Sequence, residues 1–281
     1  MRVTFWGTRG SIAAPGAGTV RFGGDTSCVS VSGDDPGHLL ILDAGSGLRR
    51  LGASIGPEVQ RIDLLLSHLH LDHIVGLGFF EPFFRTDLAV SVWAPPSTVP
   101  LWQRLGRYLS PPLFPVRVRD LGCELELQEA FDGPVRCGEF TVDAVPIIHP
   151  GATFGYRISR REASLAYLPD HEPMLSPSFP TLPEWTSGLD ICRDVDLLIH
   201  DGQYAPDEYD QHVGWGHSTG LHAVALAEMA GARELVLFHH DPSHDDEAVA
   251  RLTAEAGAAA RQVSVMAARE GQTLTLGPAG Q

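Results

Sequence analysis

Four side chains of the kinds that bind transition metals fall within six consecutive positions, 68–73, which read His-Leu-His-Leu-Asp-His. Neutral imidazole nitrogen and carboxylate oxygen are donors that suit Zn²⁺, Mn²⁺ or Fe²⁺. Residues two apart in an extended chain point the same way, so His68 and His70 can converge on one ion. Asp72 and His73, where a helix is expected to begin, can turn toward a second ion. The alternative is a polar turn that faces solvent, but such a turn would not explain why four ligand-type residues fall within six positions.

The elements that must position these residues are short apolar runs separated by glycine-rich turns. Runs typical of buried strands span residues 3–5, 28–31, 39–42, 62–66, 88–93, 140–145, 153–158, 164–168, 196–199 and 235–238. A short helix is expected at 48–51. Helical periodicity is clearest at 219–230, with Ser218 or Thr219 as N-cap, and at 245–258, which begins with acidic residues. This order predicts a layered α/β fold with helices outside, in a single domain over residues 1–281.

Composition and charge restrict the classes of partner. The net charge of −15 opposes binding to a polyanion, and we find no cluster of basic residues to invert it locally. Long nucleic acid is therefore not expected as the substrate. No apolar run approaches the ~20 residues of a membrane span. The N-terminal residues do not resemble a signal peptide, so we expect a cytoplasmic protein without membrane attachment.

The cysteines and the remaining histidines are given smaller roles. Cys28, Cys123, Cys137 and Cys192 form no Cys-x-x-Cys pair, which favours buried, reduced thiols over a cysteine-based metal site. We expect at most an outer role for His171 and His200. Surface or helix-face positions are expected for His212, His222 and His244. The aromatic-rich section between residues 79 and 114 is more typical of core than of a substrate cleft.

The segment 68–73, placed directly after an apolar strand, resembles the signature of the metallo-β-lactamase fold superfamily. Further segments extend the resemblance over residues 3–245. Asp43-Ala-Gly-Ser-Gly resembles the Asp-x-Gly turn whose aspartate supports the metal loop. His149, Asp170 and His239 match the third histidine, the bridging aspartate and the last histidine of the family. The fold that the resemblance implies is an αββα sandwich, two β-sheets with helices on the outer faces.

The resemblance also implies how two divalent ions, Zn²⁺ first and Mn²⁺ or Fe²⁺ as alternatives, would be held. One ion would lie on His68, His70 and His149. The other would lie on Asp72, His73 and His239, and Asp170 would bridge the two. His240, the next residue along, is the alternative to His239. Each ion then keeps room for a shared water or hydroxide, as a catalytic site requires.

Within the superfamily, the chain is most similar to the ribonuclease Z and phosphodiesterase branch. The residues Leu-Leu-Ile-His-Asp that end at Asp201, followed by Gly-His-Ser-Thr around His217, resemble that branch's His-Glu and Gly-His-Ser pair. There the acid orients the histidine, which donates a proton to the leaving oxygen. Asp201 stands in place of the usual Glu and is one methylene shorter. The resemblance thus assigns catalytic roles to Asp72, Asp201 and His217; the alternative is that His217 caps the next helix or bonds a core carbonyl.

We therefore expect a binuclear metal-dependent hydrolase, a phosphodiesterase that acts on a small or short phosphodiester through a hydroxide bridging the metals. Family members that process tRNA carry a long basic arm between the third histidine and the bridging aspartate. Only 21 positions separate His149 from Asp170, too few for such an arm. A homodimer is what the resemblance suggests.

Three alternatives are open at this point. A lactonase or β-lactamase type of hydrolase would use the same metals on a carbonyl, and a fold does not select the bond that is broken. A di-iron oxidoreductase is disfavoured because that branch has Glu at the position of His70 and a flavodoxin-like domain. A binding module that kept the fold is disfavoured by the complete set of ligand-type residues.

Overall fold

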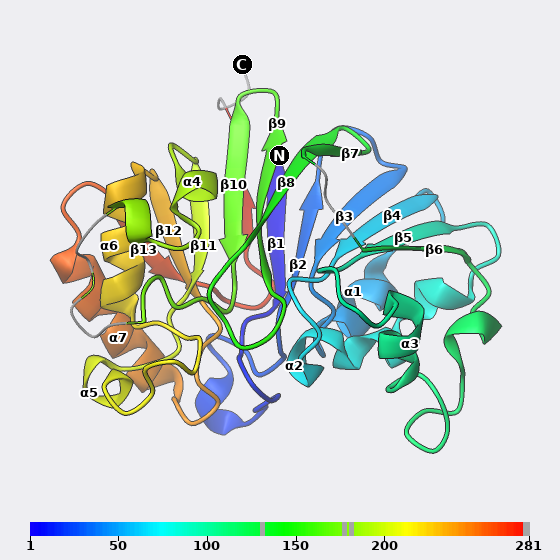
Figure 1. Cartoon of the computed structure of the whole chain (residues 1–281), viewed down its shortest axis with the longest axis horizontal. Coiled ribbons are helices and arrows are strands. Elements are labelled where there is room, and N and C mark those ends of the chain that lie inside the picture. The colour runs from blue at the N-terminus through cyan, green and yellow to red at the C-terminus, as the bar shows by residue number, and fades with distance from the viewer. Residues whose placement is uncertain (130–132, 176–178, 180–182, 278–281) are drawn as a thin grey trace.

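Two β-sheets face each other in the computed structural model (Figure 1), which describes residues 1–129, 133–175, 179 and 183–277. Within these ranges each sheet has seven strands. The order in the first sheet is β14 (Thr273–Thr275), β1 (Arg2–Gly7), β2 (Cys28–Ser32), β3 (His38–Leu42), β4 (Arg61–Leu65), β5 (Ala89–Trp93) and β6 (Glu124–Gln128). The order in the second is β13 (Ser264–Ala267), β12 (Glu234–Phe238), β11 (Leu197–Asp201), β10 (Ala163–Leu168), β9 (Phe154–Arg160), β8 (Phe140–Pro146) and β7 (Val135–Cys137).

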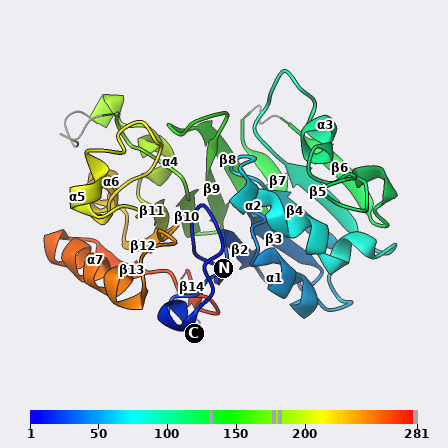
Figure 2. The same ribbon diagram turned by 90° about the horizontal axis from the view of Figure 1, so that it is seen from below.

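Helices cover the outer face of each sheet (Figure 2). Those on the side of the first sheet are α1 (Leu48–Ser54), α2 (Leu71–Ile74) and α3 (Leu101–Gly106), with the 3-10 turns η2 (Val75–Phe79), η3 (Glu81–Phe84) and η4 (Val118–Asp120). Those on the side of the second are α4 (Leu189–Cys192), α5 (Pro206–Tyr209), α6 (Gly220–Ala230) and α7 (Asp246–Ala259). Two further turns are η1 (Ala17–Thr19) and η5 (Pro183–Trp185). The predicted αββα sandwich is confirmed.

Three apolar layers hold the sandwich together. The central layer packs the facing sides of the two sheets, as Phe5 of β1 and Phe238 of β12 do with ring centroids 6.2 Å apart. A second layer joins the first sheet to its helices, and a third joins the second sheet to α4, α6 and α7. Strands such as β4 and β11 are buried on both faces, which is why they read as continuous apolar runs rather than as alternating ones.

The parallel strands in each sheet bring their carboxyl ends to one edge of the sandwich. β3 pairs in parallel with β4, so that Leu42 lies opposite Leu65. In the other sheet β10, β11 and β12 are parallel neighbours, and Asp201 lies opposite Phe238. The loops that leave these five strands therefore meet at the same edge, the usual place for a site in sheets of this kind. Every metal-ligand candidate except His149 follows one of these strands.

Most predicted elements are present, and the differences lie in short or polar segments. All ten predicted strands and the three predicted helices are found, with ends shifted by a few residues. Thr219 is the N-cap of α6, because its side chain accepts from the N–H of His222, and Asp245 caps α7 in the same way. The prediction overlooked β6, β7, β13, β14, α3, α4 and α5. The single-domain prediction stays a prediction, and residues 278–281 lie outside the described ranges.

Further expectations concern the cysteines, the aromatic section and membrane spans. All four cysteines are free and buried, as expected. The core interpretation of the aromatic section holds for Phe80 and Phe83 but is wrong for Phe79, Phe84 and Trp102, which are exposed. None of the helices in the described ranges combines the length and apolarity that crossing a bilayer requires.

Candidate metal centre and its flanking histidine

Five imidazoles and two carboxylates from separate stretches of chain meet at the shared edge of the two sheets. Their ligand-type atoms form two groups that share one aspartate. The first group is His68, His70, His149 and Asp170, and the second is Asp72, His73, Asp170 and His239. Six of the seven are buried, whereas His70 is open to solvent.

Asp170 lies between the two groups and turns one oxygen to each. Its Oδ2 is 3.7 Å from both His68 Nε2 and His149 Nε2. Its Oδ1 is 3.0 Å from His73 Nε2 and 3.3 Å from His239 Nε2. This is the placement that a bridging carboxylate needs.

The second group is closed by Asp72, which the first turn of α2 directs back toward the sheets. Asp72 Oδ2 is 3.2 Å from His73 Nε2 and 3.2 Å from His239 Nε2. The backbone N–H of Ser11 donates to the same oxygen at 2.8 Å, so the loop after β1 also fixes this carboxylate. His240 is not part of the group, because its Nε2 is 3.1 Å from the carbonyl of Ala268.

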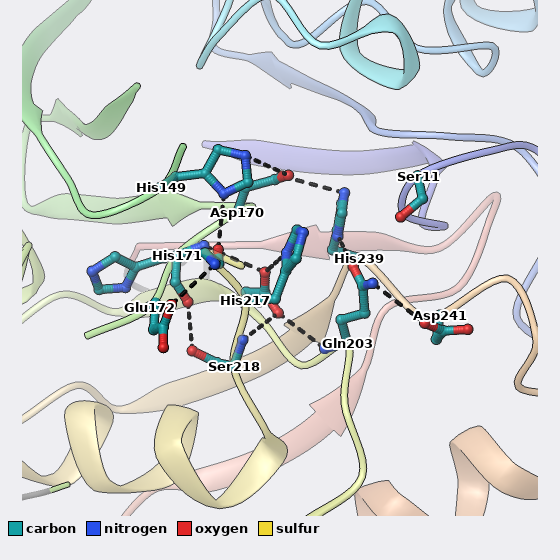
Figure 3. A network of polar contacts seen from close by, with 12 residues as sticks. Ser11, His149, Asp170, His171, Glu172, Gln203, His217, Ser218, His239 and Asp241 are labelled. Atoms are coloured by element: carbon teal, nitrogen blue, oxygen red, sulfur yellow. Dashed lines mark hydrogen bonds and ion pairs between the residues drawn. The ribbon is translucent and has the colours of Figure 1, made fainter. Parts of the chain in front are cut away.

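Polar partners outside the cluster fix which nitrogen of each ring carries a proton. His149 Nδ1 donates to the carbonyl of Gly216 at 2.9 Å. His239 Nδ1 donates to Gln203 Oε1 at 2.9 Å, and Gln203 Nε2 donates in turn to Asp241, an arrangement that Figure 3 shows. In each ring the Nε2 lone pair is then left facing the cluster, the tautomer that a metal ligand requires.

Asp43 orients side chains of the 68–73 turn in the same way, through hydrogen bonds. Its carboxylate accepts from Ser67 N at 2.6 Å, Ser67 Oγ at 2.8 Å and His73 Nδ1 at 2.8 Å. The hydroxyl of Tyr167 donates to it at 2.9 Å from the opposite sheet. Because Ser67 Oγ donates to Asp43, it accepts from His68 Nδ1, which lies 3.0 Å away. Asp43 thus orients two ligand candidates, the function that the Asp-x-Gly resemblance implies.

The electrostatics hold these groups in the forms that bind metal. Burial, with the neighbouring His73, lowers the pKa of His68 well below its usual value, and burial also lowers the pKa of His70 and His149. Burial acts to raise the pKa of Asp170, but the adjacent His239, His73 and His68 outweigh it and hold that pKa well below the usual range. Neutral imidazole and ionised carboxylate are the ligand forms of these residues.

His73 differs from its neighbours. Burial alone would lower its pKa, but Asp170, Asp72 and Asp43 together raise it well above the usual value. The three carboxylates around His73 therefore favour positive charge at this position, which a bound cation would also supply.

The donor set fits a pair of divalent ions. His68 Nε2 is buried and has no hydrogen-bond partner among the described residues. Two pairs of ring nitrogens face each other, His149 Nε2 with His70 Nδ1 at 3.1 Å and His73 Nε2 with His239 Nε2 at 3.3 Å. A tetrahedral ion with bonds of ~2.0–2.1 Å separates neighbouring donors by roughly 3.4 Å. The spacing is therefore that of ligands around an ion.

His217 packs against this cluster. Its ring is stacked on that of His239, with centroids 5.0 Å apart and planes at 15°, and its centroid is 5.1 Å from that of His149. Its Nδ1 donates to Asp201 Oδ2 at 2.7 Å, so the shorter acid reaches the ring without difficulty. Burial alone would lower the pKa of His217, but the charge and hydrogen bond of Asp201 raise it to about 9. The ring is thus a protonated imidazolium at neutral pH in the metal-free chain.

The backbone holds the other oxygen of Asp201. Its Oδ1 accepts from the N–H of Gln203 at 2.9 Å and from that of Ser218 at 3.1 Å. Asp201, His217 and His239 also form a third group with metal-ligand spacing. Since both oxygens of Asp201 already accept hydrogen bonds, this group fits an acid that orients a histidine better than it fits a third ion. His217 caps no helix, because that position belongs to Thr219.

The other histidines have structural partners. His200 Nδ1 donates to the carbonyl of Asp201 at 2.8 Å, and His171 Nδ1 lies 2.8 Å from His200 Nε2, which gives both rings outer positions. His222 is not at the surface but buried on α6 against Tyr209, with ring centroids 4.4 Å apart. His244 lies 3.2 Å from Glu208.

Several residues of the site were not singled out in the sequence. Gln203 bonds His239, Tyr167 bonds the supporting Asp43, and Glu172 holds the loop at Gly214 and Gly216. None of the three stands in a pattern with a known spacing. Glu172 illustrates the case: it is fully buried, and it accepts from the N–H groups of Gly214 and Gly216 at 3.0 Å. The only signal available was its position two residues after Asp170 in a loop that otherwise contains His and Pro.

Comparison with known proteins agrees with the geometry. A family model described as the beta-lactamase superfamily domain matches residues 38–240. A ribonuclease Z from Haloarcula marismortui is 27% identical over 283 residues, covering 85% of this chain and 86% of that protein. An uncharacterized protein of Mycobacterium tuberculosis is 31% identical, covering 72% of this chain and 70% of that protein.

Solved structures show the same arrangement of sheets and helices. The metallo-beta-lactamase fold protein YhfI from Bacillus subtilis superposes with a TM-score of 0.72 at 21% identity, covering 97% of this chain and 98% of that one. The short form of human tRNase Z gives 0.69 at 19% identity, with 99% and 100% coverage. A diphosphatase from the PhnP family gives 0.67 at 20% identity, with 98% and 97% coverage. At these identities the likeness concerns the fold.

Proposed function

This chain belongs to the metallo-β-lactamase superfamily, and from that premise we propose that it is a phosphodiesterase that requires two divalent metal ions. The observation that carries the proposal is that two groups of residues lie together at one edge of the sandwich. One is the group of seven donors around Asp170, and the other is His217 held by Asp201 against that group. Ester hydrolysis needs the first, and release of a poor leaving group needs the second.

We assign His68, His70 and His149 to one ion and Asp72, His73 and His239 to the other, with Asp170 shared between them. Zn²⁺ suits this mixture of imidazole and carboxylate, and Mn²⁺ and Fe²⁺ accept the same donors. Bound ions of this kind activate water and neutralise charge that builds on phosphate oxygens.

The chain's own residues supply the proton transfers. Attack forms a bond between the water oxygen and phosphorus, and the bond from phosphorus to the leaving oxygen breaks. His217, protonated and packed against the donor cluster, donates its Nε2 proton to that leaving oxygen. Asp201 keeps the ring oriented and favours its protonated form. We assign to Asp72 the role of accepting the proton that the attacking water loses.

A small or short diester is the substrate class that the chain favours. The chain between His149 and Asp170 is taken up by β9 and β10, which are joined by a tight turn, so no arm for a large substrate extends there. The net charge of −15 also opposes a long polyanion. The relatives named ribonuclease Z do not support excluding long RNA, so short and long substrates are compared directly in the test.

The test is a panel of substrates given to protein of known metal content. We expect hydrolysis of bis-p-nitrophenyl phosphate and of a cyclic nucleotide, and much slower turnover of a monoester, a lactone, a β-lactam and a tRNA precursor. His68→Ala should lose both metal and turnover. Lactone or β-lactam hydrolysis with no diester hydrolysis would reject the phosphodiesterase, and efficient cleavage of the precursor would reject the restriction to short substrates.

A further inference from the structure

Trp215 is an exposed indole in the loop that carries His217. The residue is 60% exposed and lies two positions before His217, between Gly214 and Gly216. Single exposed apolar side chains are common on proteins, so exposure alone indicates nothing. The construction of the loop beneath this side chain is what distinguishes it.

A buried carboxylate fixes the backbone on both sides of Trp215. Gly214 and Gly216 both have φ of +87°, a left-handed conformation that favours glycine. The N–H groups of both glycines donate to Glu172, which is fully buried, and Tyr209 donates to the same carboxylate at 2.7 Å. Hydrogen bonds to an ionised acceptor are stronger than neutral ones. The loop is therefore held at its tip, and Trp215 is presented on a fixed backbone.

The same loop is packed against the metal centre. A Cβ added at Gly216 would meet His149 Nδ1 at 2.4 Å, so the backbone beside Trp215 lies directly on a ligand candidate. The rings continue the contact. Trp215 meets His212 edge to face at 4.8 Å, His212 stacks on Tyr204 at 4.5 Å, and Tyr204 meets His217 at 5.8 Å. Three ring contacts thus connect the exposed indole to the proposed proton donor.

Charge cannot supply the remaining recognition of an anionic substrate here. The sequence contains no lysine, and its net charge is −15. Among the described residues, the hydrogen bonds of the seven ligand candidates reach no arginine. Two exposed side chains near the cluster are apolar: Leu71, between His70 and Asp72, is 61% exposed, and Ile12, which follows Ser11 in the loop that bonds Asp72, is 66% exposed. Apolar and stacking contacts are therefore the interactions that these surroundings offer to the part of the substrate outside the phosphate.

We infer that Trp215 is the surface on which a nucleobase of the substrate stacks, so that the substrate is a nucleotide diester. The inference rests on the proposed phosphodiesterase activity and specifies its substrate class. A base stacked on an aromatic side chain contributes ~1–3 kcal/mol and tolerates any base, because every base has a π-face. An indole held on a fixed loop loses little conformational entropy when it binds.

The kinetic test compares two diesters that share the p-nitrophenolate leaving group, thymidine 5′-p-nitrophenyl phosphate and methyl p-nitrophenyl phosphate. For Trp215→Ala we expect kcat/KM to fall roughly 10-fold or more on the nucleoside diester and to stay unchanged on the methyl diester. Trp215→Phe should keep most of the preference. Trp102→Ala is the matched control, because Trp102 is also 60% exposed but lies on α3. An equal loss on both diesters, or no loss, would overturn the inference.

A binding measurement separates this inference from the proposed activity. Metal-loaded protein is titrated with thymidine 5′-monophosphate and with methyl phosphate by calorimetry. We expect tighter binding of the nucleotide, and we expect Trp215→Ala to remove that advantage while metal content stays constant. If the wild type hydrolyses neither diester but keeps a Trp215-dependent advantage, the phosphodiesterase proposal fails and the stacking surface stands. If the nucleotide binds no tighter than methyl phosphate, stacking is rejected whatever the turnover.

Discussion

Replacing Asp201 by asparagine tests the proton donor without touching a proposed ligand. In the wild type, Asp201 Oδ2 accepts from His217 Nδ1 at 2.7 Å and stabilises the protonated ring. Asparagine keeps one oxygen for the backbone N–H groups of Gln203 and Ser218 and turns its NH₂ group toward the ring. His217 must then offer a lone pair at Nδ1, so the imidazolium loses its partner.

The magnitude follows from the electrostatics of the buried ring. The pKa of His217 is raised to about 9, against ~6.5 for an ordinary histidine. Asp201 is the largest cause of this elevation, so loss of its charge would destabilise the protonated form by up to about 3 kcal/mol. General acid catalysis contributes about 10²- to 10⁴-fold in rate. We therefore expect kcat of Asp201→Asn to fall on the order of 10²- to 10³-fold on a diester whose leaving group is an alkoxide.

The assay compares two leaving groups on protein of measured metal content. An alkoxide needs a proton to depart, whereas p-nitrophenolate is a stable anion and departs without one. The loss should thus be large for an alkyl diester and small for bis-p-nitrophenyl phosphate, and His217→Ala should show the same contrast. The reasoning is refuted if either variant loses equal activity on both substrates, or if it keeps the wild-type rate on the alkyl diester.

Further predictions concern the supports of the cluster. Asp43→Asn should lower the melting temperature by roughly 10 °C in thermal denaturation and weaken metal binding, because the amide cannot accept from all its present donors and breaking a buried charge pair costs about 3–5 kcal/mol. Tyr167→Phe removes only one of those donors, so calorimetry should show a loss of about 1 kcal/mol with metal content and kcat unchanged. His239→Ala should lose one metal equivalent by elemental analysis, whereas His240→Ala should keep both; the reverse result would exchange their assignments. A chelator should lower the melting temperature, and Zn²⁺ should restore it. An ion at a free concentration 100 times its Kd stabilises the folded chain by about 2.7 kcal/mol.

The sequence revealed the parts of the site that depend on local spacing. Positions 68–73 lie on one strand end and one helical turn, so the direction of each side chain follows from local geometry. His149, Asp170 and His239 could be assigned only through the family resemblance, because they come from strands far apart in the chain. The parallel pairing of β10, β11 and β12 brings Asp170 and His239 together, and His149 follows β8 of the same sheet; no single-segment pattern encodes this pairing.

The supporting residues could not have been foreseen from spacing. Tyr167 reaches Asp43 across the interface between the two sheets, and Gln203 reaches His239 between neighbouring strands. Such contacts depend on how the sheets face each other rather than on sequence separation. The overlooked strands have a similar cause. β6 and β7 stand at the edges of their sheets and mix polar with apolar residues, so their period is weak.

The most direct test of the account is a crystal structure of the metal-loaded protein with anomalous data collected at the metal edge. We predict two peaks per chain, one among His68, His70 and His149 and one among Asp72, His73 and His239, with an oxygen of Asp170 facing each. A single peak, or a peak held by Asp201 and His217, would contradict the two-ion centre on which the proposed activity depends.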